Sequence, residues 1–365
     1  MQQFNVDIFD RTMTFVCNAV TSVHSIDDDY ISPKSNAIDI INPSEQIIVG
    51  YFIRLQNDTF EFFGLITDVS PGEYVTKIQF ASFITIFSET VLMWTKLQGT
   101  ETNHNYSIEY VLNLFISTTY ITNSDTLMRL PISIEIDPDI TRTMKWFVGI
   151  RSVEEGYNYA TPNIYENLIV PALKKYGVSI TVTPDFNQKI INLLITKSSR
   201  TLNIDGNLDD VTVRTLKYND KPLGINKLTV VNLHNSNMSV TFYVHPDGSF
   251  DLDNTNRITP VSFATRLVTP SDDTSEAFAV SALDTAYDTI SGSEWNNLIE
   301  LEVDPDNENI RPKEMEVGQL VTLWYEDATY KSILTGKIIE EGKIILLFGS
   351  ERIDYTKRTK KTWRY

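Results

Sequence analysis

The residues of this chain that could carry out chemistry are few and widely spaced. Its four histidines are His24, His104, His234 and His245, and none stands at the spacing of a metal-binding motif. We therefore expect them on the surface or in packing contacts. Cys17 is the single cysteine, which excludes an internal disulfide and a multi-cysteine metal site. Its apolar neighbours favour a place in the core.

Three acidic clusters offer oxygen atoms that could bind calcium. Their members are Asp27, Asp28 and Asp29, then Asp247, Asp251 and Asp253, then Asp304, Asp306 and Glu308. None has the EF-hand spacing, with glycine at the sixth position and glutamate at the twelfth. The second cluster contains Pro-Asp-Gly-Ser, which is typical of a tight hairpin turn. Calcium binding remains an alternative, and a paired-carboxylate glycosidase site is a weaker one.

The short motifs of common enzymes are absent from the sequence. There is no Gly-x-Ser-x-Gly elbow, no His-Glu-x-x-His, no phosphate-binding Gly-Lys-Ser/Thr loop and no dinucleotide-binding fingerprint. We therefore predict no enzyme, no catalytic residue, no metal ligand and no cofactor.

Composition places the chain among ordinary soluble proteins. It has 365 residues, of which 42% are hydrophobic and 22% charged, enough to bury the cores of two to four domains. No run of eighteen apolar residues and no signal-peptide pattern occurs, so membrane insertion is not expected. The net charge of -17 argues against a free-standing polyanion binder, because phosphate contacts need clustered Lys and Arg.

Two surface features are candidate interfaces. The last nine residues contain no acid, and their basic residues are Lys357, Arg358, Lys360, Lys361 and Arg364. They form either a solvated tail or a segment that docks on an acidic surface of a partner subunit. Trp324 and Tyr325 stand at a presumed hairpin tip, where they could stack on sugars, pack in a barrel or contact another subunit. We favour the subunit interface, because aromatic residues are enriched there.

The strand and helix patterns divide the chain into four parts. Residues 1–100 predict a first small antiparallel β-barrel, 101–205 a mixed α/β module, 206–355 a second β-barrel with an inserted helix near 272–290, and 356–365 a basic tail. The fold class is therefore α+β, mainly β, with two related barrels flanking the α/β module.

Three helices are expected between the strands. The first buries Ile108, Val111, Leu112 and Phe115 on one face. The second begins near Thr161 and Pro162 and ends at Gly177, and Pro171 should kink or split it. In the third, the residues at helical spacing are Val280, Leu283, Tyr287 and Ile290.

One pattern occurs twice in the chain. Val49-Gly50 opens a strand that crosses an acidic turn and reaches Gly64, and Val317-Gly318 opens a similar stretch that reaches Gly336. The two glycines are 14 positions apart in the first copy and 18 in the second, a difference that a loop insertion would absorb. Upstream, Asn-Ala-Ile-Asp-Ile from Asn36 matches Asn-Leu-Ile-Glu-Leu from Asn297. We interpret the pattern as an internal duplication, with chance similarity of strand-rich segments as the alternative.

Two similar barrels in one chain have a geometric use. Three chains around a threefold axis would present six near-equivalent barrels, on which a sixfold ring could sit. The sequence thus favours a symmetry adaptor.

The order of these stretches resembles a known family. The segments are NAIDI, VGYFIRL and FFGLITDV near the start, NIYENLI and ALKKYGVSITV in the middle, and NKLTVVN, VHPDGSF, NLIELEV, VGQLVTL, LTGKII and IILLFGSERI towards the end. Together they resemble the baseplate hub proteins of tailed phages (siphophages), also called the tail-associated lysin N-terminal family and similar to the central hub of contractile tails. The resemblance covers nearly the whole chain and rests on strand patterns and glycines.

The resemblance implies a structural role in the virion. Members of this family form trimers whose barrels alternate around a pseudo-sixfold ring that contacts the hexameric distal tail protein. DNA passes through the ring without sequence-specific binding, and the receptor-binding proteins of the baseplate are further neighbours. The implied location is the tail tip or baseplate of the virion, after synthesis in the host cytoplasm.

Two other functions stay open at this point. One is a receptor- or carbohydrate-binding tail module, and the other is a cell-wall hydrolase. Longer members carry a hydrolase or fibre after the hub, whereas this sequence ends about fifteen residues after Leu-Leu-Phe-Gly-Ser-Glu-Arg-Ile, so we do not expect a hydrolase here.

Overall fold

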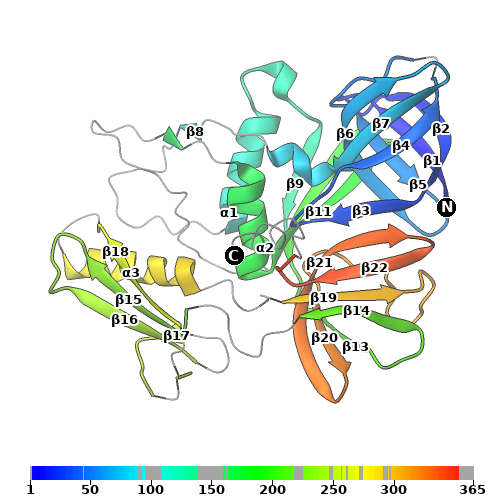
Figure 1. Cartoon of the computed structure of the whole chain (residues 1–365). Coiled ribbons are helices and arrows are strands. Elements are labelled where there is room, and N and C mark those ends of the chain that lie inside the picture. Colours follow the sequence, from blue (N-terminus) through cyan, green and yellow to red (C-terminus); the bar gives the residue numbers. More distant parts are fainter. Residues whose placement is uncertain are drawn as a thin grey trace, which may run out of the picture.

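The computed structural model describes residues 2–43, 45–88, 93–94, 108–138, 159–160, 163–217, 225–245, 250–255, 257–259, 262–270, 274–290, 295 and 297–352. In this part of the chain the fold is mainly β, with one nearly closed barrel-like sheet and several further sheets, as the sequence predicted. Figure 1 shows two β-rich units at the right of the molecule, helices in the middle and a smaller sheet with one helix at the left.

The first barrel is a six-stranded antiparallel sheet. Its strands lie in the order β2-β1-β5-β6-β7-β4, and β2 and β4 approach each other so that the sheet nearly closes. The bounds are β1 Gln2–Phe9, β2 Phe15–Val23, β4 Asn36–Ile41, β5 Phe52–Gln56, β6 Glu61–Pro71 and β7 Val75–Ser82.

The second barrel repeats this arrangement. Its path is β13-β20-β21-β22-β19-β14, so the cyclic order of strands matches that of the first barrel, with β13 and β14 in the places of β1 and β2. One difference is that β13 pairs parallel with β20, whereas β1 pairs antiparallel with β5. The bounds are β13 Thr201–Asp205, β14 Val211–Lys217, β19 Leu298–Val303, β20 Leu320–Tyr325, β21 Ala328–Glu340 and β22 Lys343–Phe348.

The repeated Val-Gly stretches occupy equivalent positions in the two barrels. The N–H of Gly50 donates to the Ile66 carbonyl oxygen at 2.9 Å, and the N–H of Gly318 donates to that of Leu334 at 2.8 Å. Each glycine is the third residue of a four-residue turn and has a positive φ, +91° and +93°, as a type II turn requires. The internal duplication is therefore present in the backbone as well as in the sequence.

The register of the two copies corrects two details of the sequence comparison. Ile66 pairs with Phe80 as Leu334 pairs with Phe348, so each residue of the first copy from Gly50 onward corresponds to the residue 268 positions later. Gly336 therefore corresponds to Asp68 and not to Gly64, and no insertion separates the copies. Both copies carry a bulge here, at Ile66/Asp68 and at Leu334/Gly336.

The second correction concerns the upstream strands. Asn36 pairs with Phe80, whereas the residue paired with the equivalent Phe348 is Ile299. Asn297 thus lies two residues before the position that corresponds to Asn36. A shift of two keeps every side chain on the same face of the sheet, so the apolar pattern alone could not detect it.

A mixed α/β module lies beside both barrels. Its three-stranded sheet has the order β11-β12-β9, in which β11 and β12 form a hairpin and β12 pairs parallel with β9. The bounds are β9 Ile132–Ile136, β11 Val178–Asp185, β12 Ile190–Lys197, α1 Ile108–Ile116, α2 Val170–Tyr176, the 3-10 helices η1 Phe83–Ser88 and η3 Thr126–Met128, the π-helical turns η2 Ser117–Ile121 and η4 Tyr165–Ile169, and the short pair β8 Met93–Trp94 and β10 Tyr159–Ala160.

The helices of this module follow the sequence analysis closely. The predicted face of α1 is buried, from Ile108 to Phe115. Pro171 does not split the second helix: the π-helical turn η4 continues directly into α2, with Ile169 and Val170 both in the right-handed helical conformation, and the proline sits in the first turn of α2. Gly177 ends α2 with φ +66°. Thr161 and Pro162 lie outside the described residues.

A separate small sheet is inserted between β14 and β19. Its order is β17-β16-β15-β18, and α3 packs on it to form a core of its own. The bounds are β15 Lys227–Asn232, β16 Ser239–Val244, β17 Phe250–Asp251, β18 Phe263–Val268 and α3 Ser275–Ile290. The sequence pattern predicted these strands as part of the second barrel, which is wrong, because in the described part of the chain they pair only with one another. The buried face of α3 contains Phe278, Ala282, Ala286 and Ile290, whereas Leu283 is exposed.

The equivalent glycines Gly50 and Gly318 provide a matched stability test. An alanine at either position adopts a left-handed conformation, which costs about 1–2 kcal/mol. At Gly318 the added Cβ would also lie 2.6 Å from the Ser179 Oγ, whereas at Gly50 the nearest atom is 3.9 Å away. We expect Gly318→Ala to lower the free energy of unfolding more than Gly50→Ala, measured by urea denaturation. Equal losses would contradict this account.

Candidate functional site at the junction of the barrels

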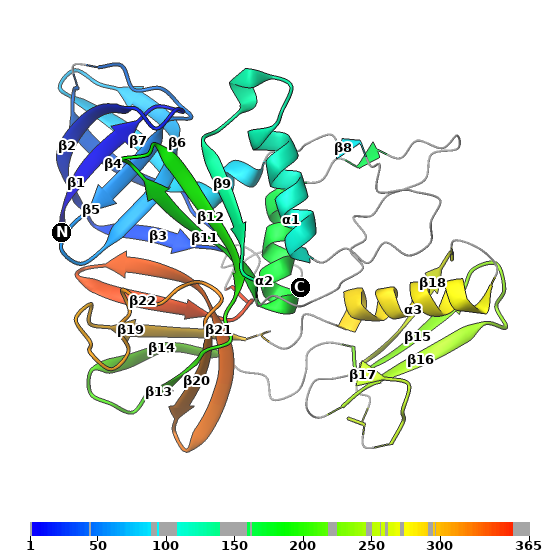
Figure 2. The ribbon, with the colours of Figure 1, turned by 180° about the vertical axis from the view of Figure 1, so that it is seen from behind.

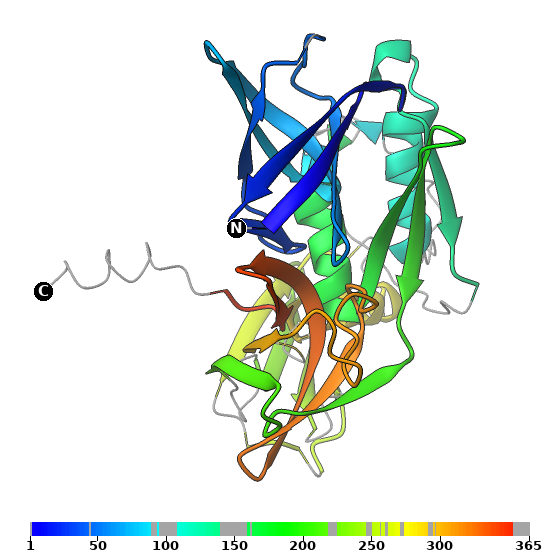
Figure 3. The ribbon, with the colours of Figure 1, turned by 90° about the vertical axis from the view of Figure 1, so that its right-hand side faces the viewer.

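Strand β3, Ser25–Asp29, joins the two barrels. It follows β2 of the first barrel but pairs antiparallel with β21 of the second, from Ser25 opposite Glu340 to Asp29 opposite Gly336. Figures 2 and 3 show it running across the junction between the two units. One hydrophobic core accordingly contains side chains of both barrels.

A buried ion pair holds the end of β3 in place. Asp29 is 3% exposed, and its carboxylate accepts hydrogen bonds from Arg352 Nε at 2.6 Å and Nη2 at 2.8 Å. The guanidinium also donates to Thr335 Oγ1 at 2.8 Å and to the carbonyl oxygens of Gly349 and Glu351. This two-pronged geometry suits arginine and compensates both charges for their loss of water.

Neighbouring residues extend this network into the α/β module. The N–H of Tyr30 donates to the Thr335 carbonyl oxygen at 2.9 Å, and the Tyr30 hydroxyl accepts the N–H of Ile180 at 3.0 Å. The Tyr165 hydroxyl donates to the Tyr30 carbonyl oxygen at 2.7 Å. Asp29 and Tyr30 therefore connect the second barrel and the α/β module to a strand that starts in the first barrel.

Asn36 fixes the other side of β3. Its amide donates to the Asp27 carbonyl oxygen at 2.9 Å and accepts the Asp27 N–H at 2.7 Å. Asn297 has a comparable structural role in the second barrel, where its Oδ1 accepts the Ser332 hydroxyl at 2.6 Å. Both asparagines are buried and satisfied, so neither is available to a ligand.

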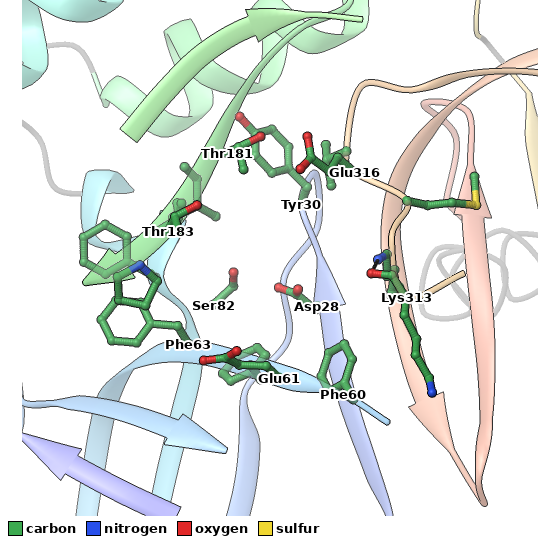
Figure 4. A pocket seen from close by; sticks show the side chains of 18 of the residues that line it. Asp28, Tyr30, Phe60, Glu61, Phe63, Ser82, Thr181, Thr183, Lys313 and Glu316 are labelled. Carbon is green, nitrogen blue, oxygen red and sulfur yellow. Dashed lines mark hydrogen bonds between the residues drawn. The ribbon is translucent and has the colours of Figure 1, made fainter. Parts of the chain in front are cut away.

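A cavity of about 560 Å³ opens at this junction. Its walls come from the β5–β6 hairpin, from β3, from β11 and from the segment before β20, as the side chains in Figure 4 show. Burial raises the pKa of the Asp28 carboxyl, an effect that Ser82 and Lys337 oppose. Burial lowers the pKa of Lys337 to about 8, against the opposing effect of Asp28 and Glu316. Asp28, Lys337 and Glu316 thus form a charge cluster between the barrels, and the Ser82 side chain hydrogen-bonds the Asp28 carboxylate.

The predicted interface residues Trp324 and Tyr325 lie at the end of β20, beside the turn to β21. Glu326 and Asp327 form this turn with positive φ values of 47° and 62°, typical of a type I′ hairpin. Trp324 is 47% exposed, whereas Tyr325 packs against the shared core of the barrels. Their role in a subunit interface stays a prediction. The basic residues Lys357, Arg358, Lys360, Lys361 and Arg364 lie outside the described residues.

The acidic clusters serve other purposes in this structure. Asp27, Asp28 and Asp29 belong to β3 rather than to a loop. Asp251 lies 2.9 Å from His245 Nε2, Asp304 pairs with Lys343 at 2.7 Å and Asp306 pairs with Lys313 at 2.7 Å. Within the described ranges, no group of three His, Cys, Asp or Glu side chains is placed to hold a metal ion. Asp247 and His104 lie outside those ranges, and Cys17 is half-buried against the shared core.

Arg352 completes the junction and was not among the predicted site residues. It lies in the stretch Ser350-Glu351-Arg352, which was noted only for the family resemblance, and its partner Asp29 is 323 residues away. The sequence does contain one indication of a buried acid, the run Asp27-Asp28-Asp29 inside a strand. Because successive side chains of a strand face opposite sides, a strand with one buried side buries at least one of these acids. No helix in the described part of the chain combines the length and apolar character needed to cross a membrane.

Removal of Arg352 should be strongly destabilising, because it leaves the Asp29 carboxylate buried without its partner. We expect Arg352→Ala to lower the free energy of unfolding by about 3–5 kcal/mol. The matched control is Arg311→Ala, which removes an exposed pair with Glu314 at 3.7 Å and should cost less than about 1 kcal/mol. Denaturant titration measures the free energy of unfolding of both variants. Similar losses would show that the buried Asp29–Arg352 pair contributes no more to stability than an exposed pair.

The half-buried Lys337 predicts a dependence of stability on pH. Its pKa is about 8 in the folded protein and 10.5 ordinarily, so between these values the unfolded state binds more protons. The free energy of unfolding should therefore rise with pH in this window relative to a Lys337→Met variant. Thermal or urea unfolding at pH 7 to 10.5 provides the comparison. Parallel curves for the two proteins would contradict the prediction.

No family model matches the chain, and no curated protein matches it in sequence. Among solved structures, the 43 kDa tail protein of prophage MuSo2 from Shewanella oneidensis aligns with a TM-score of 0.49 and 12% identity, over 96% of this chain and 98% of that chain.

Two further structures align over similar lengths. Prophage tail protein gp18 from Listeria monocytogenes EGD-e has a TM-score of 0.47 and 10% identity, over 98% of both chains. A chain of the phage P2 baseplate in its activated conformation with Ca has a TM-score of 0.45 and 12% identity, over 94% of this chain and 98% of that chain. These three solved structures are phage baseplate and prophage tail proteins.

Proposed function

We propose that this chain is a structural hub protein in the tail tip or baseplate of a tailed phage. It forms a trimer that joins the sixfold tail to a threefold tip and surrounds part of the route of the DNA. The observation that carries the proposal is the pair of barrels with one strand order and one register in a single chain. Three chains then supply six barrels to a hexameric distal tail protein.

The two barrels combine a common backbone with different surfaces. At the end of the first barrel, Ile41 and Val75 form an exposed cross-strand pair, 80% and 46% exposed. The equivalent residues of the second barrel are Asp304 and Lys343, which form an ion pair. In a ring of six barrels, apolar and charged positions would then alternate. The backbone outline of the ring would have sixfold symmetry, whereas its surface chemistry would have threefold symmetry.

A hub that transmits force needs barrels in a fixed relation. The shared core, the strand β3 and the buried Asp29–Arg352 pair supply that rigidity here. The charge of -17 suits a conduit, because an acidic wall repels DNA phosphates and lets the strand slide. The basic residues Lys357, Arg358, Lys360, Lys361 and Arg364 would dock on a neighbouring subunit, and Trp324 is a separate candidate for a subunit contact.

The solution mass tests the trimer. We expect light scattering of the purified protein to give three times the chain mass of 41.7 kDa, with a higher mass when a hexameric distal tail protein is added. The same instrument on serial dilutions separates a weak trimer from a stable one. A strict monomer at every concentration, with and without that partner, would refute the trimeric hub.

A further inference from the structure

Strand β6 of the first barrel has one uncovered edge beyond Ile66. Strand β5 pairs with β6 only from Glu61 to Leu65, whereas β7 pairs with β6 as far as Pro71. Among the described residues, no strand pairs with the other side of residues 67–71. We call these five residues the open edge.

The second barrel shows what covers the same edge when it is filled. Thr67, Val69 and Pro71 correspond to Thr335, Lys337 and Ile339 of β21. In the second barrel this side of β21 pairs with β3, and the Tyr30 N–H donates to the Thr335 carbonyl oxygen. The equivalent position in the first barrel lacks such a strand among the described residues.

The turn beside the open edge is also uncovered. Ile48 and Val49 are 47% and 55% exposed. Their counterparts are Glu316 and Val317, and the Val317 carbonyl oxygen accepts the Ser179 hydroxyl of β11 at 2.9 Å while its side chain packs against the core of the α/β module. One face of the second barrel thus contacts strand β3 and the α/β module. Among the described residues, no strand pairs with the equivalent edge of the first barrel.

We propose that the open edge, together with Ile48 and Val49, accepts an extended strand from a second copy of this chain. The contact of β3 with β21 is head-to-tail, because the first barrel supplies the strand and the second receives it. When such a contact repeats around a closed ring, the second barrel of one copy faces the first barrel of the next. The open edge lies where that next strand would pair. This inference rests on the proposed trimer.

The backbone of the open edge sets the length of the added strand. The Thr335 carbonyl oxygen accepts the Tyr30 N–H. In an antiparallel ladder every second residue turns its backbone N–H and carbonyl groups to the same partner strand, so those of Lys337 and Ile339 face β3 as well. In the first barrel these groups belong to Thr67, Val69 and Pro71. Pro71 has no N–H, so the Val69 N–H is the central donor of the edge. Unpaired edges of this kind are templates for another strand.

Amide hydrogen exchange of the assembled wild-type protein tests the proposal directly. The Val69 amide should exchange as slowly as the Lys337 amide, its counterpart beneath β3, and it should speed up when the protein is diluted to monomers. Lys337 is the internal control, because its strand partner belongs to the same chain. Rapid exchange of Val69 in an assembled protein with a slow Lys337 amide would overturn the proposal and leave the trimer intact.

Two variants test the same surface through assembly. Val69→Pro removes the central donor, and Ile48→Glu places the acid of the second barrel on the exposed turn. Each should raise the concentration for half-assembly more than about tenfold in light scattering, because one lost hydrogen bond or apolar contact acts at every interface of the ring. Leu127→Glu is the control, because Leu127 is 83% exposed on the α/β module.

The outcomes separate the edge from the trimer. Circular dichroism establishes that each variant is folded, and Ile48→Glu decides alone if Val69→Pro does not fold. A trimeric wild type whose Ile48→Glu variant assembles like Leu127→Glu would overturn the open edge as the interface. A wild type that stays monomeric at every concentration overturns both the edge and the trimeric hub.

Discussion

The pairing of β3 with β21, secured by the Asp29–Arg352 ion pair, is the contact on which the arrangement of this molecule depends. Without it the barrels would be two independent units on a common chain. With it, one core runs through both, and Tyr30 connects the same strand to the α/β module. A buried charge pair adds little net stability compared with apolar packing, but it permits one geometry and penalises others. That is the property a rigid connector needs.

The two barrels show how far side chains can diverge while a backbone is retained. Register in an antiparallel sheet requires the alternation of buried and exposed positions and the right turns, and both copies keep these. Equivalent surface positions carry different chemistry, such as Ile41 and Val75 against Asp304 and Lys343. One chain therefore presents two faces with the same backbone and different side chains.

The elements of the fold were largely predictable, and their partners were not. Val49-Gly50 and Val317-Gly318 stood out because both glycines have a backbone angle that other residues resist. Gly64 and Gly336 were matched wrongly because each glycine makes room for a different neighbour, the Ala81 carbonyl oxygen and the Asp29 backbone. The strands of the inserted sheet carried the right pattern, but a pattern of apolar residues does not say which strand lies beside it. The junction site escaped because its residues come from opposite ends of the chain.

The separation of Asp29 from Arg352 also orders events during synthesis. A ribosome completes β1 to β7 long before β21 or Arg352 leaves the exit tunnel, since 323 positions lie between the two charges. The first barrel can close by itself, whereas β3 must wait as an unpaired strand with a carboxylate that has no partner. Contacts this distant in sequence form late and slowly. The nascent chain therefore exposes this edge until β21 has been made, and the pairing of β3 with β21 then protects it from aggregation.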